Sequence, residues 1–174
     1  MPITRLNHAV LYVRNVDRSV AFYSDVLGFR RVDMTPEGFT GAAFLQAAGS
    51  ANDHDLGLFE IGAQAGASQA GRSTVGLYHL AWEVDTLAEL DAVRGRLVAA
   101  GALVGASDHS TSKSLYGRDP DGIEFEVAWF VPAALLDEAT LAGRKDGIRP
   151  LELEQEIRRY GATTPGASSA THPA

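Results

Sequence analysis

The chain has no cysteine among its 174 residues. This absence excludes disulfides, thiolate metal sites and cysteine nucleophiles, so a metal ion would have to be held by His, Asp, Glu or water. Positive charge is also scarce, because 15 Lys and Arg stand against 22 Asp and Glu and give a formal net charge of −7. A broad surface for phosphate groups is therefore not expected, and nucleic acid is a poor candidate partner.

Long hydrophobic runs are missing as well. No apolar segment reaches the roughly 20 residues that a membrane-spanning helix needs, and the opening "MPITRLNHAVLYV" lacks the features of a signal peptide. We therefore expect a soluble, cytoplasmic protein with no membrane partner. The composition, 45% hydrophobic and 21% charged, suits one globular domain of medium size.

An internal repeat organises most of the sequence. The apolar segment "LNHAVLYV" (6–13) returns as "LYHLAWEV" (77–84), with Leu, His and Val in the same places. Each copy predicts a strand that is followed by a helix and three further strands. The sequence therefore predicts an α+β fold, in which two βαβββ modules (about 5–61 and 76–131) form a curved mixed sheet within a domain of residues 1–131.

Local signals predict where the two helices begin and end. Asn15 or Asp17 can cap the first helix, and Gly28 ends it. Thr86 and Glu89 have the spacing of a capping box at the start of the second helix. The Gly- and Ala-rich stretch 62–76 predicts a flexible connection between the modules.

The composition changes after Pro132. Residues 132–174 predict a helical extension, with amphipathic helices in "AALLDEATLAG" and "PLELEQEIRRYG". The last stretch, "TTPGASSATHPA", predicts a disordered end. We assign this extension no chemistry and expect it to cover either the domain or a partner subunit.

Three residues are candidate metal ligands. His8 and His79 occupy matching positions in the repeat, and Glu126 follows the turn "DPDG" on an alternating strand, "IEFEV". Two imidazoles and one carboxylate form the ligand set that holds Fe(II) on one face and leaves positions open. A cation would neutralise an inward carboxylate whose burial is otherwise costly. The competing interpretation is that both histidines are structural or exposed, and neighbouring Glu124 is expected to be solvated near the rim.

The segments "LNHAVLYVRNVDRSVAFYSDVLGF", "GLYHLAWEV" and "DPDGIEFEV" resemble the vicinal oxygen chelate superfamily of glyoxalases, extradiol dioxygenases and antibiotic-resistance proteins. The resemblance covers about residues 5–131. It implies paired modules around a metal cup, with ligands at the positions of His8, His79 and Glu126. It also implies a homodimer.

Two further segments resemble the type I extradiol ring-cleaving dioxygenases. "HDLGLF" is similar to the strand that carries an acid–base histidine, here His54, and "DHSTSKSLYG" is similar to the segment that carries a second histidine and a tyrosine, here His109 and Tyr116. A catechol must lose protons to chelate iron, and histidine and tyrosine are suited to that transfer. Each of the three could instead be an exposed or packed side chain. Lys113 could help to bind an anionic group, but it is expected to be solvated.

Three functions remain as hypotheses. The leading one is an Fe(II)-dependent extradiol dioxygenase of aromatic catabolism that cleaves a catechol-type diol with O₂ as cosubstrate; Mn, Ni or Zn are alternative metals. The second is a glyoxalase-like isomerase or lyase with Ni or Zn, in which Glu60, aligned with Glu126 by the similar "FEI" and "FEV", is a fourth ligand. The third is a metal-free protein that sequesters an aromatic drug.

Overall fold

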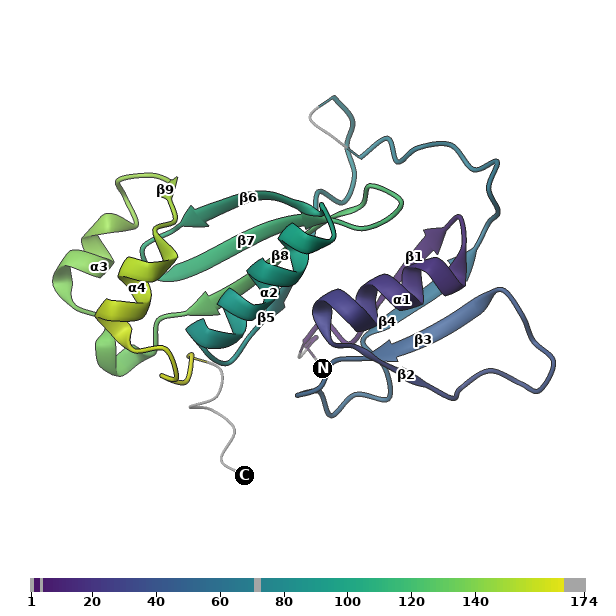
Figure 1. The fold of residues 1–174 in the computed structure, drawn as a ribbon, viewed down its shortest axis with the longest axis horizontal. Helices are drawn as coiled ribbons and strands as arrows, with labels where there is room; N and C mark the ends of the chain where they lie inside the picture. Colours follow the sequence, from purple (N-terminus) through teal and green to yellow (C-terminus); the bar gives the residue numbers. More distant parts are fainter. Residues whose placement is uncertain (1, 4, 71–72, 168–174) are drawn as a thin grey trace. The chain divides into compact units, whose positions relative to one another are not determined.

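The computed structural model describes residues 2–3, 5–70 and 73–167 (Figure 1). The chain forms two compact units. The first comprises Met1–Gln69 and Asp119–Gly122, and the second Ala70–Arg118 and Ile123–Ala174. The chain has the predicted α+β fold with two βαβββ modules, and the turn Asp119–Gly122 of the second module belongs to the first unit. Every helix in the described ranges is too short or too polar to traverse a lipid bilayer.

The first unit is a four-stranded sheet covered by one helix. Its elements are β1 (Ala9–Val13), α1 (Val16–Leu27), β2 (Arg30–Val32), β3 (Ala42–Gln46) and β4 (Leu56–Glu60). The sheet order is β1-β4-β3-β2, with β1 parallel to β4 and the other pairs antiparallel. Leu11 and Val13 of β1 are buried on the side that α1 covers, whereas Val10 and Tyr12 are exposed on the other side.

The ends of α1 follow the predicted signals. The side chain of Asn15, and not that of Asp17, caps the helix by accepting a hydrogen bond from the Arg18 N–H. Gly28 ends it in the left-handed conformation, with φ of 77°.

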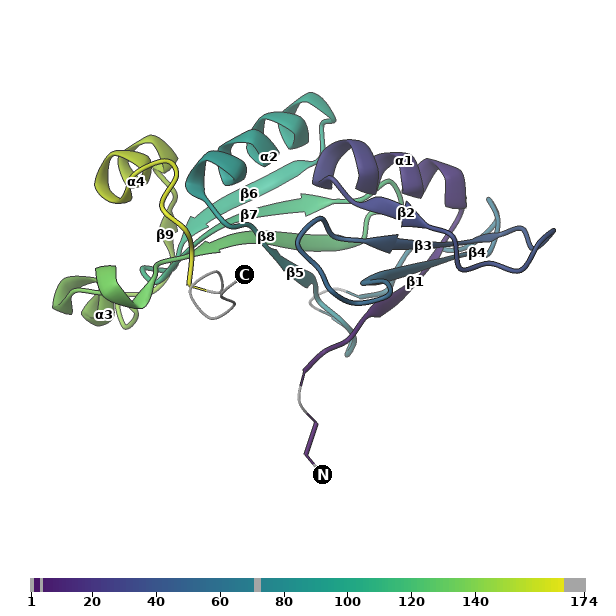
Figure 2. The same cartoon turned by 90° about the horizontal axis from the view of Figure 1, so that it is seen from below.

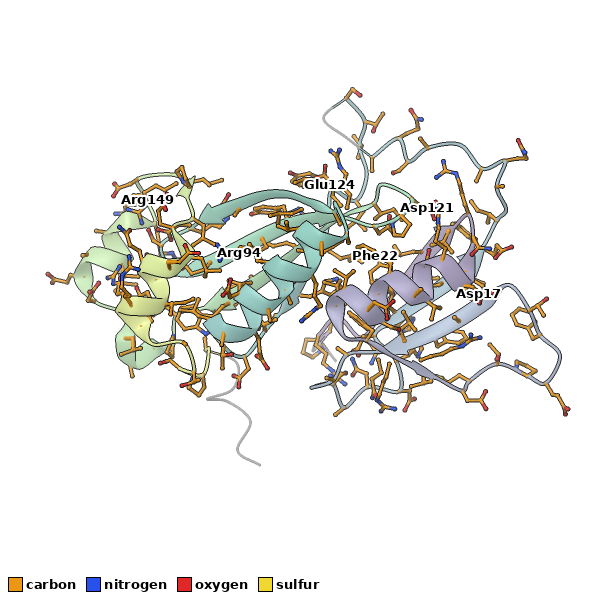
Figure 3. All side chains as sticks on the ribbon, in the orientation of Figure 1. Asp17, Phe22, Arg94, Asp121, Glu124 and Arg149 are labelled. Atoms are coloured by element: carbon orange, nitrogen blue, oxygen red, sulfur yellow. The ribbon has the colours of Figure 1, made fainter. Side chains whose placement is uncertain are left out.

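The turn Asp119–Gly122 packs on this unit, beside α1. Asp121 pairs with Arg14 at 2.9 Å and with Arg18 at 2.7 Å, and its side chain is only 6% exposed (Figure 3). The buried Tyr23 hydroxyl donates to Asp119 at 3.2 Å, and burial together with this carboxylate raises the pKa of the tyrosine well above its ordinary value. The predicted turn therefore also ties this piece of chain to α1.

The second unit is a five-stranded sheet with the order β5-β8-β7-β6-β9. Its elements are β5 (Leu80–Glu83), α2 (Leu87–Ala99), β6 (Leu103–Asp108), β7 (Ser112–Arg118), β8 (Glu124–Phe130), a 3₁₀ turn (Ala133–Leu135), α3 (Glu138–Gly143), β9 (Arg149–Pro150) and α4 (Leu153–Tyr160). The helix α2 covers one face of this sheet (Figure 2) and begins with the predicted capping box of Thr86 and Glu89. The strands β7 and β8 are antiparallel, and β5 runs parallel to β8.

Side chains of the second sheet alternate between a covered face and an open face. Phe125 and Val127 are buried on the covered face, together with Leu115 of β7. Glu126 and its cross-strand partner Tyr116 are therefore on the open face. The alternation predicted for "IEFEV" is confirmed.

The extension after residue 131 is fastened to the second sheet. Lys113 of β7 is 1% exposed, and its ammonium group pairs with Asp108 at 2.5 Å and with Glu156 of α4 at 2.9 Å. Arg149, labelled in Figure 3, pairs with Asp108 at 2.9 Å. The expectation that Lys113 is solvated was wrong, because the strand alternation puts it on the same buried face as Leu115.

Residues near the end of the described chain are also bound to this unit. Gly166 donates its N–H to the Asp85 carbonyl at 2.7 Å, and Ala167 donates to the Phe130 carbonyl at 3.1 Å. Gly166 and Ala167, which lie in the stretch predicted to be disordered, thus each donate a backbone hydrogen bond to this unit. The remainder of that predicted end lies outside the described residues.

Candidate active site

His79 and Glu126 form the centre of the candidate site in the second unit. His79 immediately precedes β5, and its Nε2 lies 3.1 Å from Glu126 Oε2. Both side chains are largely buried, at 25% and 15% exposure. The Nδ1 atom of His79 is buried without a hydrogen-bond partner among the described residues. The pair therefore places one imidazole nitrogen and one carboxylate oxygen at contact distance on the open face.

Tyr116 and His109 lie next to this pair. Tyr116 faces Glu126 across the β7–β8 ladder, and its ring centroid is 5.9 Å from that of His79. Its hydroxyl shares a hydrogen bond of 2.8 Å with His109 Nε2. Burial raises the pKa of Tyr116, and the charge of Glu126 raises it further, so the phenol keeps its proton at neutral pH. The hydroxyl can therefore act as a hydrogen-bond donor.

These four side chains line one cavity of about 890 Å³. Phe130 of β8 and Ile148 of the extension contribute apolar surface to its wall. Glu124, predicted to be solvated near the rim, also lines the cavity and accepts a hydrogen bond from Arg118 at 2.6 Å. A cavity of this size, with apolar walls and a few convergent polar groups, suits a small organic molecule.

His8 and His54 lie together in the first unit. Their ring centroids are 4.5 Å apart, and the Phe44 ring packs against His54 at 5.0 Å. His8 precedes β1, and its Nδ1 donates to the side-chain oxygen of Asn7 at 2.7 Å. This hydrogen bond leaves Nε2 of His8 as the free acceptor, which is the arrangement found in metal-ligating histidines. The Nδ1 atom of His54 is buried with no hydrogen-bond partner in the described part of the chain.

Glu60 is not the structural counterpart of Glu126. Glu126 pairs with Ala81, two residues after His79, whereas Val10, two residues after His8, pairs with Gly57. The alignment of "FEI" with "FEV" was therefore wrong by three residues.

The side chain of Glu60 points to the helix side of its sheet. Glu60 lies beside the buried Val13 in the β1–β4 ladder, and its Oε2 accepts a hydrogen bond of 2.9 Å from the Val16 N–H, the first of α1. A carboxylate at this position stabilises the helix terminus. The carboxylate of Glu60 thus binds the helix terminus on one face of the sheet, whereas Val10, Tyr12 and Gly57 lie on the opposite face.

The donor atoms fit a divalent metal. Two ligands on adjacent positions of an octahedral ion, with bonds of about 2.1 Å, are about 3 Å apart, which agrees with the 3.1 Å between His79 and Glu126. Within the described residues no group of three or more His, Asp or Glu side chains gathers to hold a metal. A facial set of two His and one carboxylate therefore requires a ligand beyond His79 and Glu126.

Several residues of the cavity were not predicted from the sequence, and three of them belong to the extension. Arg144, between α3 and β9, lines the cavity together with Gly147 and Ile148. The amphipathic pattern of the extension predicted helices but gave no signal for this short connection.

Comparisons with known proteins cover most of the chain. Residues 5–127 match the model of the Glyoxalase/Bleomycin resistance protein/Dioxygenase superfamily. A catechol-2,3-dioxygenase of Bacillus subtilis (strain 168) is 32% identical over 131 residues, 71% of this chain. The chain spans only 41% of that relative's length.

Solved structures show similar folds. A glyoxylase/bleomycin resistance protein/dioxygenase domain from Frankia sp. EAN1pec is 25% identical, with a TM-score of 0.60 over 73% of this chain and 92% of its own. A lactoylglutathione lyase from Agrobacterium tumefaciens is 26% identical, with a TM-score of 0.52 over 74% of this chain and 95% of its own.

Proposed function

The chain belongs to the Glyoxalase/Bleomycin resistance protein/Dioxygenase superfamily, and from this we propose that it is a cytoplasmic, Fe(II)-dependent extradiol dioxygenase that cleaves a catechol-type aromatic diol with O₂. The observation that carries the proposal is the cavity lined jointly by His79, Glu126, Tyr116 and His109. The identity to a catechol-2,3-dioxygenase supports the same reaction class.

In this proposal His8, His79 and Glu126 hold the metal. Bound Fe(II) supplies the activation of O₂, which protein side chains cannot provide. The neutral Tyr116 hydroxyl donates its one proton to a hydrogen bond with an oxygen of the bound diol. Its oxygen accepts a hydrogen bond from His109 Nε2–H, which orients it. His109 and His54 take up and return the protons that the diol loses and the product gains. The apolar part of the cavity wall excludes water from the aromatic ring.

The test is anaerobic reconstitution with Fe(II) followed by addition of catechols and O₂. We expect a yellow ring-opened product and stoichiometric O₂ consumption. Glu126→Gln should abolish product formation and O₂ consumption and weaken Fe(II) binding. The control is Glu83→Gln, which lies on β5 on the same face of the sheet as Glu126 but outside the cavity lining, and it should retain both activities and Fe(II) binding. A lack of product and O₂ uptake over monocyclic and bicyclic diols would refute the proposal.

A second candidate function is a glyoxalase-like lyase with Ni or Zn, supported by the likeness to the Agrobacterium tumefaciens lyase. A four-ligand site with Glu60 is not favoured, because that carboxylate already binds the start of α1. The metal content of protein purified from its native source distinguishes the two functions, and size-exclusion chromatography of the same sample tests the expected homodimer.

A further inference from the structure

The extension that follows the family match contributes to the cavity wall. Arg144, Gly147 and Ile148 line the cavity and lie beyond residues 5–127, which match the family model. Part of the cavity wall therefore comes from residues outside the segment that matches the family, and the family match gives them no role.

Arg144 differs from the other charged groups of the wall. Arg118 is paired with Glu124 at 2.6 Å, and Glu126 faces His79 at 3.1 Å. Arg144 is exposed to solvent and has no hydrogen-bond or ion-pair partner among the described residues. Its guanidinium group is therefore available to an anionic group of a bound molecule.

The residues on both sides of Arg144 are held in place. Gly143, the last residue of α3, packs so closely on Ser110 that a Cβ there would clash with its hydroxyl. Arg149, after the connection, donates to the Ser110 hydroxyl at 3.0 Å and to Asp108 at 2.9 Å. Ser110 lies in the turn between His109 and Thr111, which themselves line the cavity. The connection that carries Arg144 is thus anchored to the turn that carries His109.

We propose that Arg144 binds an anionic substituent of the substrate and that the protein selects aromatic diols that carry a carboxylate over neutral diols. This inference rests on the proposed function for the identity of the aromatic diol. Phe130 and Ile148 supply apolar contact for a ring in the same cavity, and a guanidinium group can bind a carboxylate through two parallel hydrogen bonds.

The test compares the binding of 3,4-dihydroxybenzoate and neutral 4-methylcatechol by calorimetry, without O₂, to the full chain with and without Fe(II). Arg144→Met should weaken binding of the benzoate about tenfold and leave 4-methylcatechol unchanged, and Arg144→Lys should be intermediate. Lys145→Met is the matched control, because it removes the adjacent exposed charge outside the cavity lining.

The outcomes separate this inference from the proposed function. An Arg144→Met variant that binds the two diols in the same ratio as the unaltered protein overturns the inference, as does a failure of the unaltered protein to bind the benzoate. If Arg144-dependent binding is present but O₂ produces no ring-opened product, the dioxygenase function falls and the anion subsite stands. If both diols are cleaved with a ratio that Arg144→Met does not change, the subsite falls and the function stands.

Discussion

The buried ammonium group of Lys113 provides a quantitative test of how the extension is held. It is 1% exposed and pairs with Asp108 and Glu156, whose side chains are 12% and 13% exposed. Lys113→Met keeps an unbranched side chain but leaves the buried carboxylate of Glu156 without its cation and leaves Asp108 with Arg149 alone. Removal of one partner from a buried ion pair costs about 3–5 kcal/mol, so we expect the free energy of unfolding of the second unit to fall by that amount.

The assay is urea unfolding followed by tryptophan fluorescence. Both tryptophans, Trp82 and Trp129, are in the second unit, so the signal reports on that unit selectively. Trp129 is fully buried and packs on Tyr160 of α4, with ring centroids 5.4 Å apart. Detachment of α4 should therefore shift its emission. The control Lys145→Met removes an exposed charge and should change stability by less than about 0.5 kcal/mol.

The effect should depend on pH in a defined direction. Burial alone would raise the pKa of Asp108, but its hydrogen bonds from Lys113 and the Ser110 N–H, with the charges of Lys113 and Arg149, lower it below the ordinary 3.8. The ionised carboxylate therefore stabilises the folded state above the pKa of the unfolded chain, and this contribution is lost as pH falls through the lowered folded value. In the Lys113→Met variant, protonation of Asp108 instead relieves negative charge that the ammonium group no longer balances. The stability difference between the two proteins should thus shrink in acid.

A compensated variant completes the test. Combining Lys113→Met with Asp108→Asn and Glu156→Gln removes all three charges and should recover most of the loss. The reasoning fails if the free energy of unfolding of Lys113→Met is within about 1 kcal/mol of that of the unaltered protein at neutral pH. It also fails if the compensated variant is as unstable as the single variant.

Two further substitutions test the assigned roles. Glu60→Gln should reduce stability by about 0.5–1 kcal/mol and speed hydrogen exchange at the start of α1, with Fe(II) affinity unchanged; a large loss of metal affinity would show that Glu60 is a ligand after all. Tyr116→Phe removes the hydroxyl that bonds to His109 and should lower kcat about a hundredfold with little change in KM, measured from the ring-opened product; an unchanged kcat would show a packing role only.

The architecture was predictable because its signals are local or repeated. The asparagine at position 15, the capping box of Thr86 and Glu89, and Gly28 each act within one turn of the helix that they delimit. The repeat marked both histidines, although both strands begin one residue after them, at Ala9 and Leu80.

The errors arose where residue identity alone had to determine register. "FEI" and "FEV" look equivalent, yet the pairing of β1 with β4 shifts the equivalence to Gly57, and a shift of three residues reverses the face. Lys113 was predicted to be solvated because a lysine is almost never buried unless it is paired. Its partner Glu156 lies 43 residues later (113 to 156), in a helix whose packing against β7 no local sequence pattern indicates.

The register difference between the two modules bears on the chemistry that each can support. Position 57 in the first unit corresponds to Glu126, and a Cβ there would meet the Val10 side chain at 3.4 Å and the Phe44 ring at 3.6 Å. Both are ordinary van der Waals distances, so Val10 and Phe44 border the space that a longer side chain would enter. The duplicated module thus supplies a histidine twice and a carboxylate of this kind once. A ligand set with a single carboxylate leaves coordination positions open for a chelating diol and O₂, which favours ring cleavage over a reaction that needs four protein ligands.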